Sequence, residues 1–538
     1  MDNLLLLGDE AIAQGALDGG LSGIYAYPGT PSTEITEYVR SSRYAEENNI
    51  HREWSANEKT AMESALGMSY AGKRAMVCMK HVGLNVAADP FMNASITGVN
   101  GGLIVVVADD PSMHSSQNEQ DSRFYGSFAM VSVFEPSNQQ EAYEMAYHGF
   151  DLSEQLKLPV LLRIPTRLAH SRSAVKRREQ QLQNDVSIPG NLHQFVLLPV
   201  FARQNYEGLL SKQAGMEEAS ANSGFNRYFD GTNKDLGIIA SGIAFNYVME
   251  NYRKNELKYS LLKLSQYPLP EKLIHRMLDS CKKVLVIEEG YPFIEEKLKG
   301  FQEKGTPVIG KLDGTLPRTG ELNPDHVAAA LGIETEKGEA VPEIVKKRPP
   351  AMCKGCGHIE SYNALNEALQ DYSKGRVFSD IGCYTLGALP PFEAINSCVD
   401  MGASITMAKG AADAGLVPAV AVIGDSTFTH SGMTGLLDCV IEKTPVTVII
   451  SDNFTTAMTG GQDSHALGRL EQICEGIGVE KDHIRVFRPA RNNIDQMVHI
   501  MKEEMAYEGV SVIIPRRQCV QTARNKKLNA RLKELGLK

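Results

Sequence analysis

The sequence lacks the features of a membrane-spanning, secreted or disulfide-bonded protein. No apolar run approaches the roughly 20 residues that a helix needs to cross a bilayer, so we expect no membrane span. No basic segment precedes the short leucine run near Met1, which argues against a signal peptide and for a cytoplasmic protein. The nine cysteines are an odd number in a long chain, and two of them form a CxxC pair. This usage favours reduced thiols and a metal over a disulfide framework.

An excess of positive charge is also absent. The sequence has 55 Lys and Arg against 65 Asp and Glu, a net charge of −10. This balance argues against a dedicated nucleic-acid binder, because neutralising phosphates requires a basic face. With 43% hydrophobic and 22% charged residues the composition is globular, and 538 residues suggest three or four domains, or fewer large α/β ones.

Short β-rich runs alternate with helical stretches along the whole chain. This alternation predicts α/β domains built on parallel sheets with helices on both faces. The expected strands are 23–27, 74–79, 103–108, 159–163, 236–240, 261–264, 283–287, 307–309, 376–379, 418–423, 446–450 and 510–514. A helix is expected over 57–70, a basic, Gln-rich linker or exposed connection over 172–184, and a charged, proline-bearing linker between domains over 334–350.

A diphosphate and metal site is predicted at two successive strand ends. Gly424, Asp425 and Ser426 follow one strand, and 26 residues (427–452) separate Ser426 from Asn453, which follows the next strand. Because such strand ends lie side by side, Asp425 and Asn453 can converge and offer Mg²⁺ the oxygen ligands it prefers. The alternative is a helix-capping turn with an unrelated Asn. The spacing favours the metal and resembles the magnesium-diphosphate motif of thiamine diphosphate enzymes.

Four cysteines form a second candidate metal site. Cys353 and Cys356 make the CxxC pair, 26 residues (357–382) separate Cys356 from Cys383, and Cys519 is the candidate fourth ligand. Four thiolates suit zinc or a [4Fe–4S] cluster, and packed core thiols are the alternative. The neighbouring diphosphate motif favours iron–sulfur, because an electron carrier is useful beside a carbanion-forming cofactor. His358, after the pair, is equally consistent with capping or packing.

Three further residues have both a structural and a functional interpretation. Ser55 and Glu58 fit a capping box, whereas the functional alternative has Glu58 hydrogen-bonding the aminopyrimidine of thiamine; the pattern alone favours the cap. Thr30, in a Pro/Gly turn, could bind a keto-acid carboxylate or cap the next helix. Arg123 is a possible carboxylate partner, although a lone arginine is more often a solvated surface residue.

Taken together, these motifs resemble the alpha subunits of the indolepyruvate:ferredoxin oxidoreductase family, which are thiamine diphosphate-dependent 2-oxoacid:ferredoxin oxidoreductases. The resemblance covers nearly the whole chain. It implies a pyrimidine-binding domain at 1–185, a transketolase-C-like domain at 186–335 and a thiamine diphosphate- and Mg²⁺-binding domain at 350–538. The segments that carry it are 27–32, 58, 108–112, 283–290, 353–358, 380–387, 400–404 and 424–462.

The resemblance also implies roles for the candidate residues. Glu58 would activate thiamine, while Asp425, Asn453 and the Thr455 carbonyl would hold Mg²⁺. Thr30 and Arg123 would bind the substrate. The remaining expected contacts to the cofactor are Gly424, Ser426 and His358, and the ligands of one [4Fe–4S] cluster are Cys353, Cys356, Cys383 and Cys519.

The implied reaction is oxidative decarboxylation of an arylpyruvate, of the indolepyruvate or phenylpyruvate class, with coenzyme A. Its products would be an aryl-acetyl-CoA, carbon dioxide and reduced ferredoxin, and its partners a beta subunit in an αβ or (αβ)₂ assembly and ferredoxin. Alpha subunits of this family usually continue into a ferredoxin-like domain with two CxxCxxCxxxCP runs. This sequence has a basic tail after Cys519 instead, so we expect at most one cluster and direct electron transfer to a partner.

Two other functions compete with this one. A non-oxidative thiamine diphosphate-dependent decarboxylase or acetolactate-synthase-like enzyme would leave the four cysteines incidental. A non-catalytic zinc- or thiamine-binding scaffold would not need Glu58, Asp425 and Asn453, which are all present. The sequence does not choose among 2-oxoacids, because that choice depends on the shape of the pocket.

Overall fold

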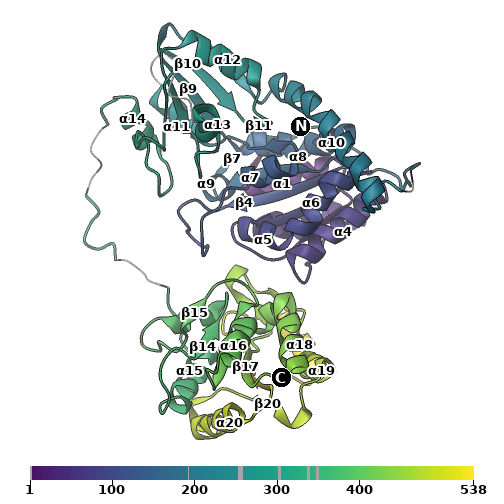
Figure 1. Cartoon of the computed structure of the whole chain (residues 1–538), viewed down its shortest axis with the longest axis vertical. Helices are drawn as coiled ribbons and strands as arrows, with labels where there is room; N and C mark the ends of the chain where they lie inside the picture. Colours follow the sequence, from purple (N-terminus) through teal and green to yellow (C-terminus); the bar gives the residue numbers. More distant parts are fainter. Residues whose placement is uncertain are drawn as a thin grey trace. The chain divides into compact units, whose positions relative to one another are not determined.

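The computed structural model describes residues 3–191, 193–252, 258–300, 305–335, 338, 340–346 and 350–537. The chain divides into two compact units, Met1–Glu339 (the N-terminal unit) and Ala340–Lys538 (the C-terminal unit), shown in Figure 1. Across the described residues, none of the helices has the length and apolar character that crossing a bilayer takes.

The N-terminal unit contains a six-stranded sheet in the order β11-β5-β6-β4-β3-β2. Its strands are parallel except for β11, the last of them in sequence, which pairs antiparallel with β5. Alternate strand residues face two separate apolar cores, so helices cover both faces of the sheet. The strands are β2 (Gly23–Ala26), β3 (Ala75–Lys80), β4 (Leu103–Asp109), β5 (Val133–Phe134), β6 (Val160–Pro165) and β11 (Gln266–Tyr267). The covering helices are α1 (Gly8–Asp18), α2 (Thr33–Ser41) and α8 (Gln139–Leu156) on one face, and α4 (Glu58–Tyr70) and α6 (Ala88–Thr97) on the other.

A second sheet of the same unit has five strands in the order β13-β12-β9-β10-β8. The strands are β8 (Arg227–Phe229), β9 (Asn233–Ser241), β10 (Tyr259–Leu264), β12 (Val284–Ile287) and β13 (Val308–Ile309). The helices of this region are α10 (Pro199–Ala221), α11 (Ala244–Asn251), α12 (Glu271–Ser280), α13 (Phe293–Lys299) and α14 (Pro324–Ala330). The segments of the predicted domains 1–185 and 186–335 lie in one compact unit, and β11 of the second segment pairs with β5 in the sheet of the first.

The basic, Gln-rich segment 172–184, predicted as a linker or exposed connection, is mostly exposed, but it begins with a strand. Its first residues form β7 (Arg172–Lys176), which pairs antiparallel with β1 (Asn3–Leu7). The next residue, Arg177, donates from Nε to the buried carboxylate of Asp18 (2.9 Å). The polar composition predicted the exposure of this segment. It could not indicate the pairing with β1 or the contact with Asp18, because both partners lie far away in the chain. The predicted linker 334–350 contains the boundary between the units, and its residues 336, 337, 339 and 347–349 lie outside the described part of the chain.

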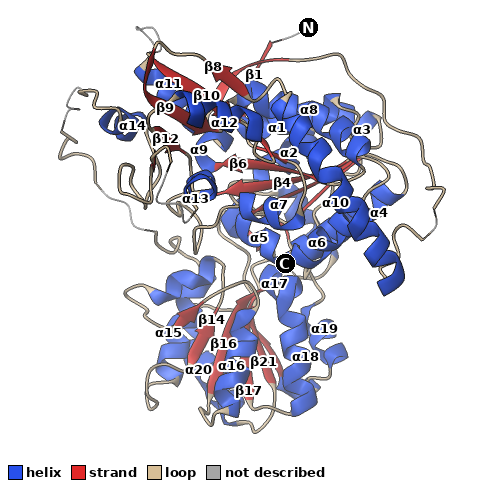
Figure 2. Ribbon diagram, turned by 45° about the horizontal axis from the view of Figure 1, so that its top comes forward, coloured by secondary structure: helices blue, strands red, loops and turns tan. Residues whose placement is uncertain are grey.

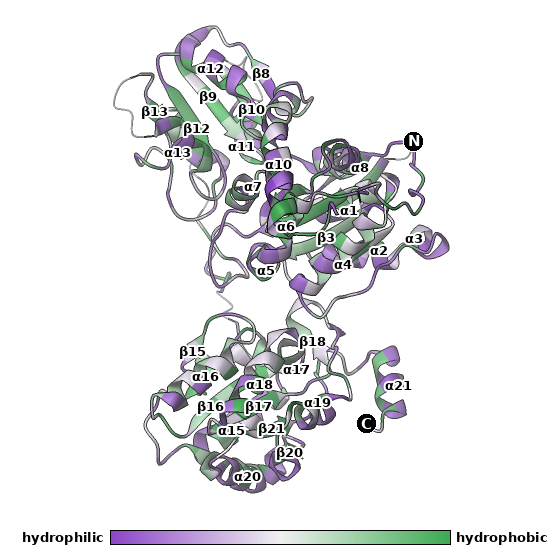
Figure 3. Ribbon diagram, turned by 45° about the vertical axis from the view of Figure 1, so that its right-hand side comes forward, coloured by the Kyte–Doolittle hydropathy of each residue, from purple (hydrophilic) through white to green (hydrophobic). Residues whose placement is uncertain are grey.

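The C-terminal unit is built on one parallel six-stranded sheet in the order β15-β14-β16-β17-β21-β20, with helices on both sides of the strands (Figure 2). Its strands are the most hydrophobic parts of the unit, as the green ribbons of Figure 3 show. The strands are β14 (Val377–Ser379), β15 (Ser397–Cys398), β16 (Ala419–Gly424), β17 (Val446–Ser451), β20 (Ile484–Phe487) and β21 (Ser511–Pro515). The helices are α15 (Gly357–Ala368) and α20 (Ile494–Ala506) on one face, and α16 (Ala403–Asp413), α18 (Met433–Glu442) and α19 (Leu470–Ile477) on the other.

The basic tail forms the last helix, α21 (Lys526–Glu534). Its buried Leu528 and Leu532 pack with Phe454 and Leu467 in a small apolar cluster. Phe454 follows Asn453 directly, so this terminal helix supports the loop that carries the predicted Mg²⁺ ligands.

Candidate cofactor site

The predicted convergence of two strand ends is present in the C-terminal unit. β16 and β17 are parallel neighbours, and Gly424 at the end of one pairs with Ser451 at the end of the other. Asp425 and Asp452 are therefore the next residues along adjacent strands, and the two hydroxyl oxygens of Ser426 and Thr456 lie 2.9 Å apart. The Gly-Asp-Ser turn and the loop after Asn453 thus form one local structure.

Asp425 is a buried acid whose carboxylate is only partly hydrogen-bonded by the described residues. Its side chain is 2% exposed, and its Oδ2 has no hydrogen-bond partner among the described residues. Burial, and after it the neighbouring Asp452 carboxylate, raise the pKa of Asp425 well above its usual range. Asp452 itself receives Nε–H of Arg516 (2.7 Å). A buried carboxylate oxygen without a partner is suited to bind a cation, and carboxylate oxygens are ligands that Mg²⁺ prefers.

The loop after β17 is held by its own hydrogen bonds. The backbone N–H of Thr455 donates to Oδ1 of Asn453 (3.1 Å). The Thr455 hydroxyl donates to the carbonyl of Gln462 (2.8 Å), which closes the short hairpin of β18 (Thr455–Thr456) and β19 (Gln462–Asp463). These contacts fix the backbone that presents the Asn453 amide and the Thr455 carbonyl.

The four predicted cysteines come together around one cavity of about 180 Å³. Burial, and after it the nearby Cys519, Cys356 and Cys353, raise the pKa of the Cys383 thiol to about 12. The loops that carry them follow β14 and β21 or precede α15. Sequence spacing indicated three of these thiols as one group, and the structure brings Cys519 to them from the far end of the domain.

The thiol cavity adjoins the strand-end loop. The backbone N–H of Cys519 donates to the carbonyl of Asn453 (3.2 Å), and Nε2 of Gln521 donates to Sγ of Cys353 (3.2 Å). Arg517 also lines the cavity. The sequence interpretation missed Arg517 and Gln521, and the only available signal was their position on either side of Cys519.

His358 lines the cavity but does not cap a helix. The residue that caps α15 is Cys356, one residue before the first helical position. His358 is 6% exposed, and burial lowers its pKa to about 4, so its ring is neutral at pH 7. The packing interpretation and a contact to a bound group both remain compatible with this position.

Asp380, just after β14, is a buried acid whose importance the sequence alone did not indicate. Its Oδ2 accepts hydrogen bonds from the Ser404 hydroxyl (2.6 Å) and the Gly402 N–H (3.2 Å). Burial raises the pKa of Asp380 to about 7, and these hydrogen bonds oppose the rise. The only hint was that Asp380 begins the motif segment 380–387, while its partners Gly402 and Ser404 lie in the motif segment 400–404.

The capping box predicted for α4 is wrong by two residues. Asn57 is the N-cap, with its Oδ1 accepting the backbone N–H of Thr60 (2.8 Å), and the Thr60 side chain completes the box. Ser55 instead donates its backbone N–H to the carbonyl of Ala26 (2.8 Å). Asn competes well with Ser as an N-cap, and backbone pairing of Ser55 decides between them. Glu58 is therefore not needed as a cap.

Glu58 lies buried at the N-terminal end of α4. Its side chain is 5% exposed and packs on Gly83, where a Cβ atom would stand 2.6 Å from Oε1 of Glu58. Burial lowers the pKa of the nearby Lys80, and the charges of Asp110 and Glu58 oppose that change. Glycine at position 83 thus leaves the space that the carboxylate occupies.

Thr30 does not cap α2, which corrects one of its two interpretations. The N-cap position is Ser32, and the backbone N–H of Gly29 donates to the Thr33 hydroxyl (3.0 Å). The carbonyl of Thr30 accepts from the Ser115 hydroxyl (3.3 Å). The prediction that Thr30 binds a carboxylate stays a prediction.

Arg123 is fully buried, so the expectation of a solvated surface arginine is wrong. Its Nε donates to Asp121 (2.9 Å), and its Nη1 donates to Glu288 (2.8 Å). Its Nη2 donates to the carbonyls of Glu289 (3.1 Å) and Tyr291 (2.9 Å). Every guanidinium nitrogen is engaged by the protein, so the geometry gives Arg123 a structural role in place of the predicted substrate contact. Asp121 is a local partner, but Glu288 lies 165 residues away in the chain, which no local pattern could indicate.

Comparison with known families defines the class of protein. Residues 14–194 match the family model described as pyruvate flavodoxin/ferredoxin oxidoreductase, thiamine diphosphate-binding. Residues 380–514 match the model of the C-terminal thiamine pyrophosphate-binding domain of thiamine pyrophosphate enzymes. The chain is thus a thiamine diphosphate-dependent enzyme component with the α/β fold expected from its sequence.

Relatives along the whole chain narrow the class to a family. The indolepyruvate oxidoreductase subunit IorA of Archaeoglobus fulgidus is 39% identical, with 96% of this chain and 86% of that protein aligned. The subunit of the same name from Pyrococcus abyssi is 38% identical over the same shares. The chain belongs to the indolepyruvate oxidoreductase IorA family, as its motifs predicted.

A solved structure supports the fold. The 2-oxoglutarate:ferredoxin oxidoreductase from Magnetococcus marinus, with 2-oxoglutarate, coenzyme A and succinyl-CoA bound, superposes with a TM-score of 0.51 at 18% identity. The match covers 62% of this chain and 65% of that one.

Proposed function

We propose that this chain is the alpha subunit of an enzyme that oxidatively decarboxylates an arylpyruvate with coenzyme A to an aryl-acetyl-CoA. Electrons pass through one [4Fe–4S] cluster to ferredoxin, and a beta subunit completes an (αβ)₂ assembly in the cytoplasm. Membership in a thiamine diphosphate-dependent 2-oxoacid oxidoreductase family supports the reaction class. The substrate in the relatives' name, indolepyruvate, supports the arylpyruvate class.

Mg²⁺ and the diphosphate are assigned to the strand-end loops. Asp425, Asn453 and the Thr455 carbonyl would hold the metal, and the unpartnered Oδ2 of Asp425 supports this assignment. The backbone at Gly424 and the Ser426 hydroxyl lie beside them and would contact the diphosphate, since N–H groups at a helix start favour anions. His358 is assigned to the cofactor side of the thiol cavity.

Glu58 is assigned to the activation of thiamine, and Thr30 to the substrate carboxylate. When bound, thiamine diphosphate supplies the electron sink that lets carbon dioxide leave a 2-oxoacid. The buried Glu58 carboxylate can exchange a proton with a ring nitrogen because its burial excludes competing water. Glu58 is the first helical residue of α4, and the capping box of this helix is formed by Asn57 and Thr60.

The gathering of Cys353, Cys356, Cys383 and Cys519 around one cavity is the observation that carries the oxidative function. A non-oxidative decarboxylase has no use for such a group. Among the residues that the structure describes, no three of these thiols lie within 4.8 Å of one another. Tetrahedral zinc, with Zn–S bonds of about 2.3 Å, would need sulfur atoms only about 3.8 Å apart. The wider spacing favours a larger cluster over zinc.

Iron and acid-labile sulfide on anaerobically purified protein test this proposal, together with an EPR spectrum after dithionite reduction. We expect about four irons per chain and the spectrum of a reduced [4Fe–4S] cluster. Cys356→Ala should abolish both. Cys398→Ala is the matched control, because Cys398 is an exposed thiol outside the cavity, and it should retain them. Absence of iron after reconstitution with the beta subunit would refute the proposal and favour the non-oxidative decarboxylase.

A further inference from the structure

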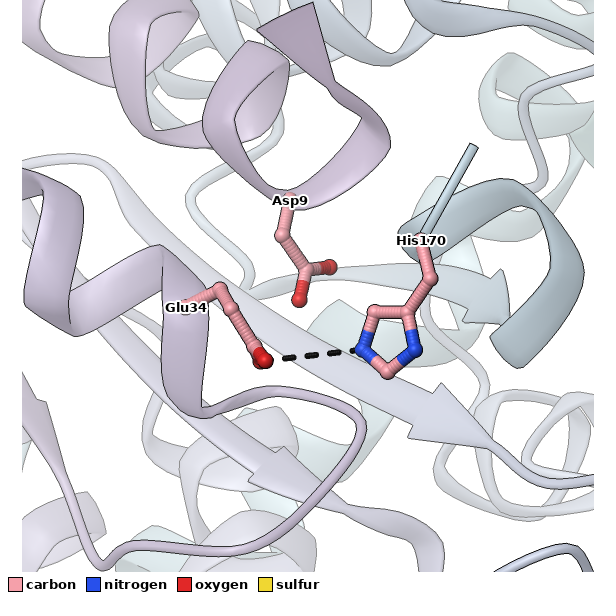
Figure 4. A group of neighbouring side chains, drawn as sticks. All are labelled: Asp9, Glu34 and His170. Carbon is pink, nitrogen blue, oxygen red and sulfur yellow. Dashed lines mark ion pairs between the residues drawn. The ribbon is translucent and has the colours of Figure 1, made fainter. Parts of the chain in front are cut away.

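A group of metal-ligand side chains that the predicted reaction does not use lies in the N-terminal unit. Asp9 comes from the first turn of α1, Glu34 from the first turn of α2, and His170 directly follows α9 (Thr166–Ala169). One ligand atom of each lies within 4.8 Å of the others, and in the described part of the chain no other such group occurs. Figure 4 shows the Asp9 carboxylate pointing between Glu34 and the imidazole of His170.

Asp9 is a buried acid whose charge no hydrogen bond among the described residues compensates. It is 0% exposed, and neither carboxylate oxygen has a hydrogen-bond partner among the described residues. Burial first, then the charges of Glu34 and Glu10, raise the pKa of Asp9 well above its usual range. No positively charged side chain is among the groups that shift the pKa of Asp9. Buried carboxylates in proteins are normally paired or bound to a metal, and in the described part of the chain neither Asp9 oxygen has a hydrogen-bond partner.

The other two side chains provide the rest of a ligand set. Nε2 of His170 and Oε2 of Glu34 lie 3.7 Å apart, close enough to interact and to face one ion together. The His170 side chain is 36% exposed, so an ion could reach the buried Asp9 carboxylate from this side. The group contains no thiol, which distinguishes its chemistry from that of the cysteine cavity.

We propose that Asp9, Glu34 and His170 bind a divalent first-row transition-metal cation of the Mn²⁺ or Fe²⁺ type. Two carboxylates neutralise the double charge, and the mixture of carboxylate oxygen and imidazole nitrogen suits these ions better than Ca²⁺ or Cu⁺. The ion provides Asp9 with the partner that the protein lacks. It also joins α1 and α2 to the end of α9, which is distant from both helices in sequence.

Mn²⁺ titration of the full chain, with its beta subunit where the two co-purify, tests the site. Saturating Mg²⁺ and thiamine diphosphate keep the Asp425 site occupied, and free Mn²⁺ is measured by EPR. We expect the wild-type protein to bind one more Mn²⁺ per chain than Asp9→Asn or His170→Gln. Glu46→Gln, which removes an exposed carboxylate from the neighbouring α3 (Arg43–Glu47), is the control and should bind like the wild type. Equal binding by all four proteins would overturn the proposal.

Thermal unfolding gives a second readout that does not depend on activity. Trp54 is the only tryptophan of the sequence and lies in the N-terminal unit, so its fluorescence follows this unit. Without metal, Asp9→Asn should melt above the wild type, because a neutral amide replaces a buried acid. Mn²⁺ should raise the Tm of the wild type by a few degrees and leave that of His170→Gln unchanged. His170 is partly exposed, so this variant keeps the test valid even if Asp9→Asn does not fold. An equal rise in both proteins would place the bound Mn²⁺ elsewhere and overturn the site.

Discussion

Replacing Arg123 by methionine should destabilise the N-terminal unit strongly and should not act primarily on substrate binding. The guanidinium compensates Asp121 and Glu288, both essentially inaccessible to solvent. After the replacement, Asp121 keeps its ion pair with Arg163, whose Nη2 lies at 3.5 Å, and the more distant charge of Lys311. Glu288 keeps the backbone N–H groups of Ile294 and Glu295 but no cation at contact distance.

The expected size of the effect follows from this burial. Removing one partner of a buried ion pair leaves an uncompensated charge and costs about 3–5 kcal/mol of unfolding free energy. Arg123→Lys keeps a charge, but a single ammonium lacks the planar fork that serves both acids and two carbonyls. We expect it to lose about 2 kcal/mol, since roughly half of the charged hydrogen bonds disappear.

Urea unfolding followed by Trp54 fluorescence measures this free energy for the N-terminal unit. Arg167→Met is the matched control, because the Arg167–Glu321 pair is partly exposed, at 36% and 15% of the two side chains. Pairs of this kind contribute at most about 1 kcal/mol. The reasoning would be refuted if Arg123→Met unfolded like the control and instead raised the KM for the 2-oxoacid, which is the signature of a substrate contact.

Three further predictions concern the cofactor site and its support. Glu58→Gln should lower kcat by about 10²–10⁴-fold while thiamine diphosphate still binds, as measured by turnover and calorimetry; unchanged turnover would exclude Glu58 from the chemistry. Burial raises the pKa of Asp380 from 3.8 to about 7, so the folded state binds this proton more tightly than the unfolded state. Stability of the cofactor-free C-terminal unit should therefore fall by about 4 kcal/mol as the pH rises from about 4 to about 7, and calorimetry should show a weaker pH dependence in Asp380→Asn. Leu532→Ala removes a fully buried side chain and should loosen α21 by about 2 kcal/mol, seen as roughly 30-fold faster amide exchange in that helix; unchanged exchange would show that the helix is held by other contacts.

Continuous apolar runs determined the central strands without help from tertiary structure. A parallel strand covered on both faces has no polar alternation, so runs such as 103–108 and 446–450 predict β4 and β17 to within a residue at either end. The neighbouring positions of Asp425 and Asn453 followed from the same rule, because consecutive parallel strands end at one edge of the sheet.

Tertiary structure decided what depends on partners distant in the chain. Ser55 lost the capping role to Asn57 because its N–H pairs with Ala26, and Arg123 became a buried ion-pair residue because Glu288 folds against it. The local sequence allows either residue to cap the helix and either a surface or a buried Arg123. Local preferences differ in free energy by less than one buried contact contributes, so the tertiary contact decides.

The cysteine site and the proposed Asp9 site show the same difference between what the sequence predicts and what the fold decides. Cys353, Cys356 and Cys383 are close enough in sequence, and distinctive enough as a residue type, for their pattern to predict a shared site. Asp9 and His170 are common residue types separated by 160 positions, and only the packing of α1 against the end of α9 brings them together. The unsatisfied Asp9 carboxylate is likewise invisible in the sequence, because burial is a property of the folded chain and not of the residue.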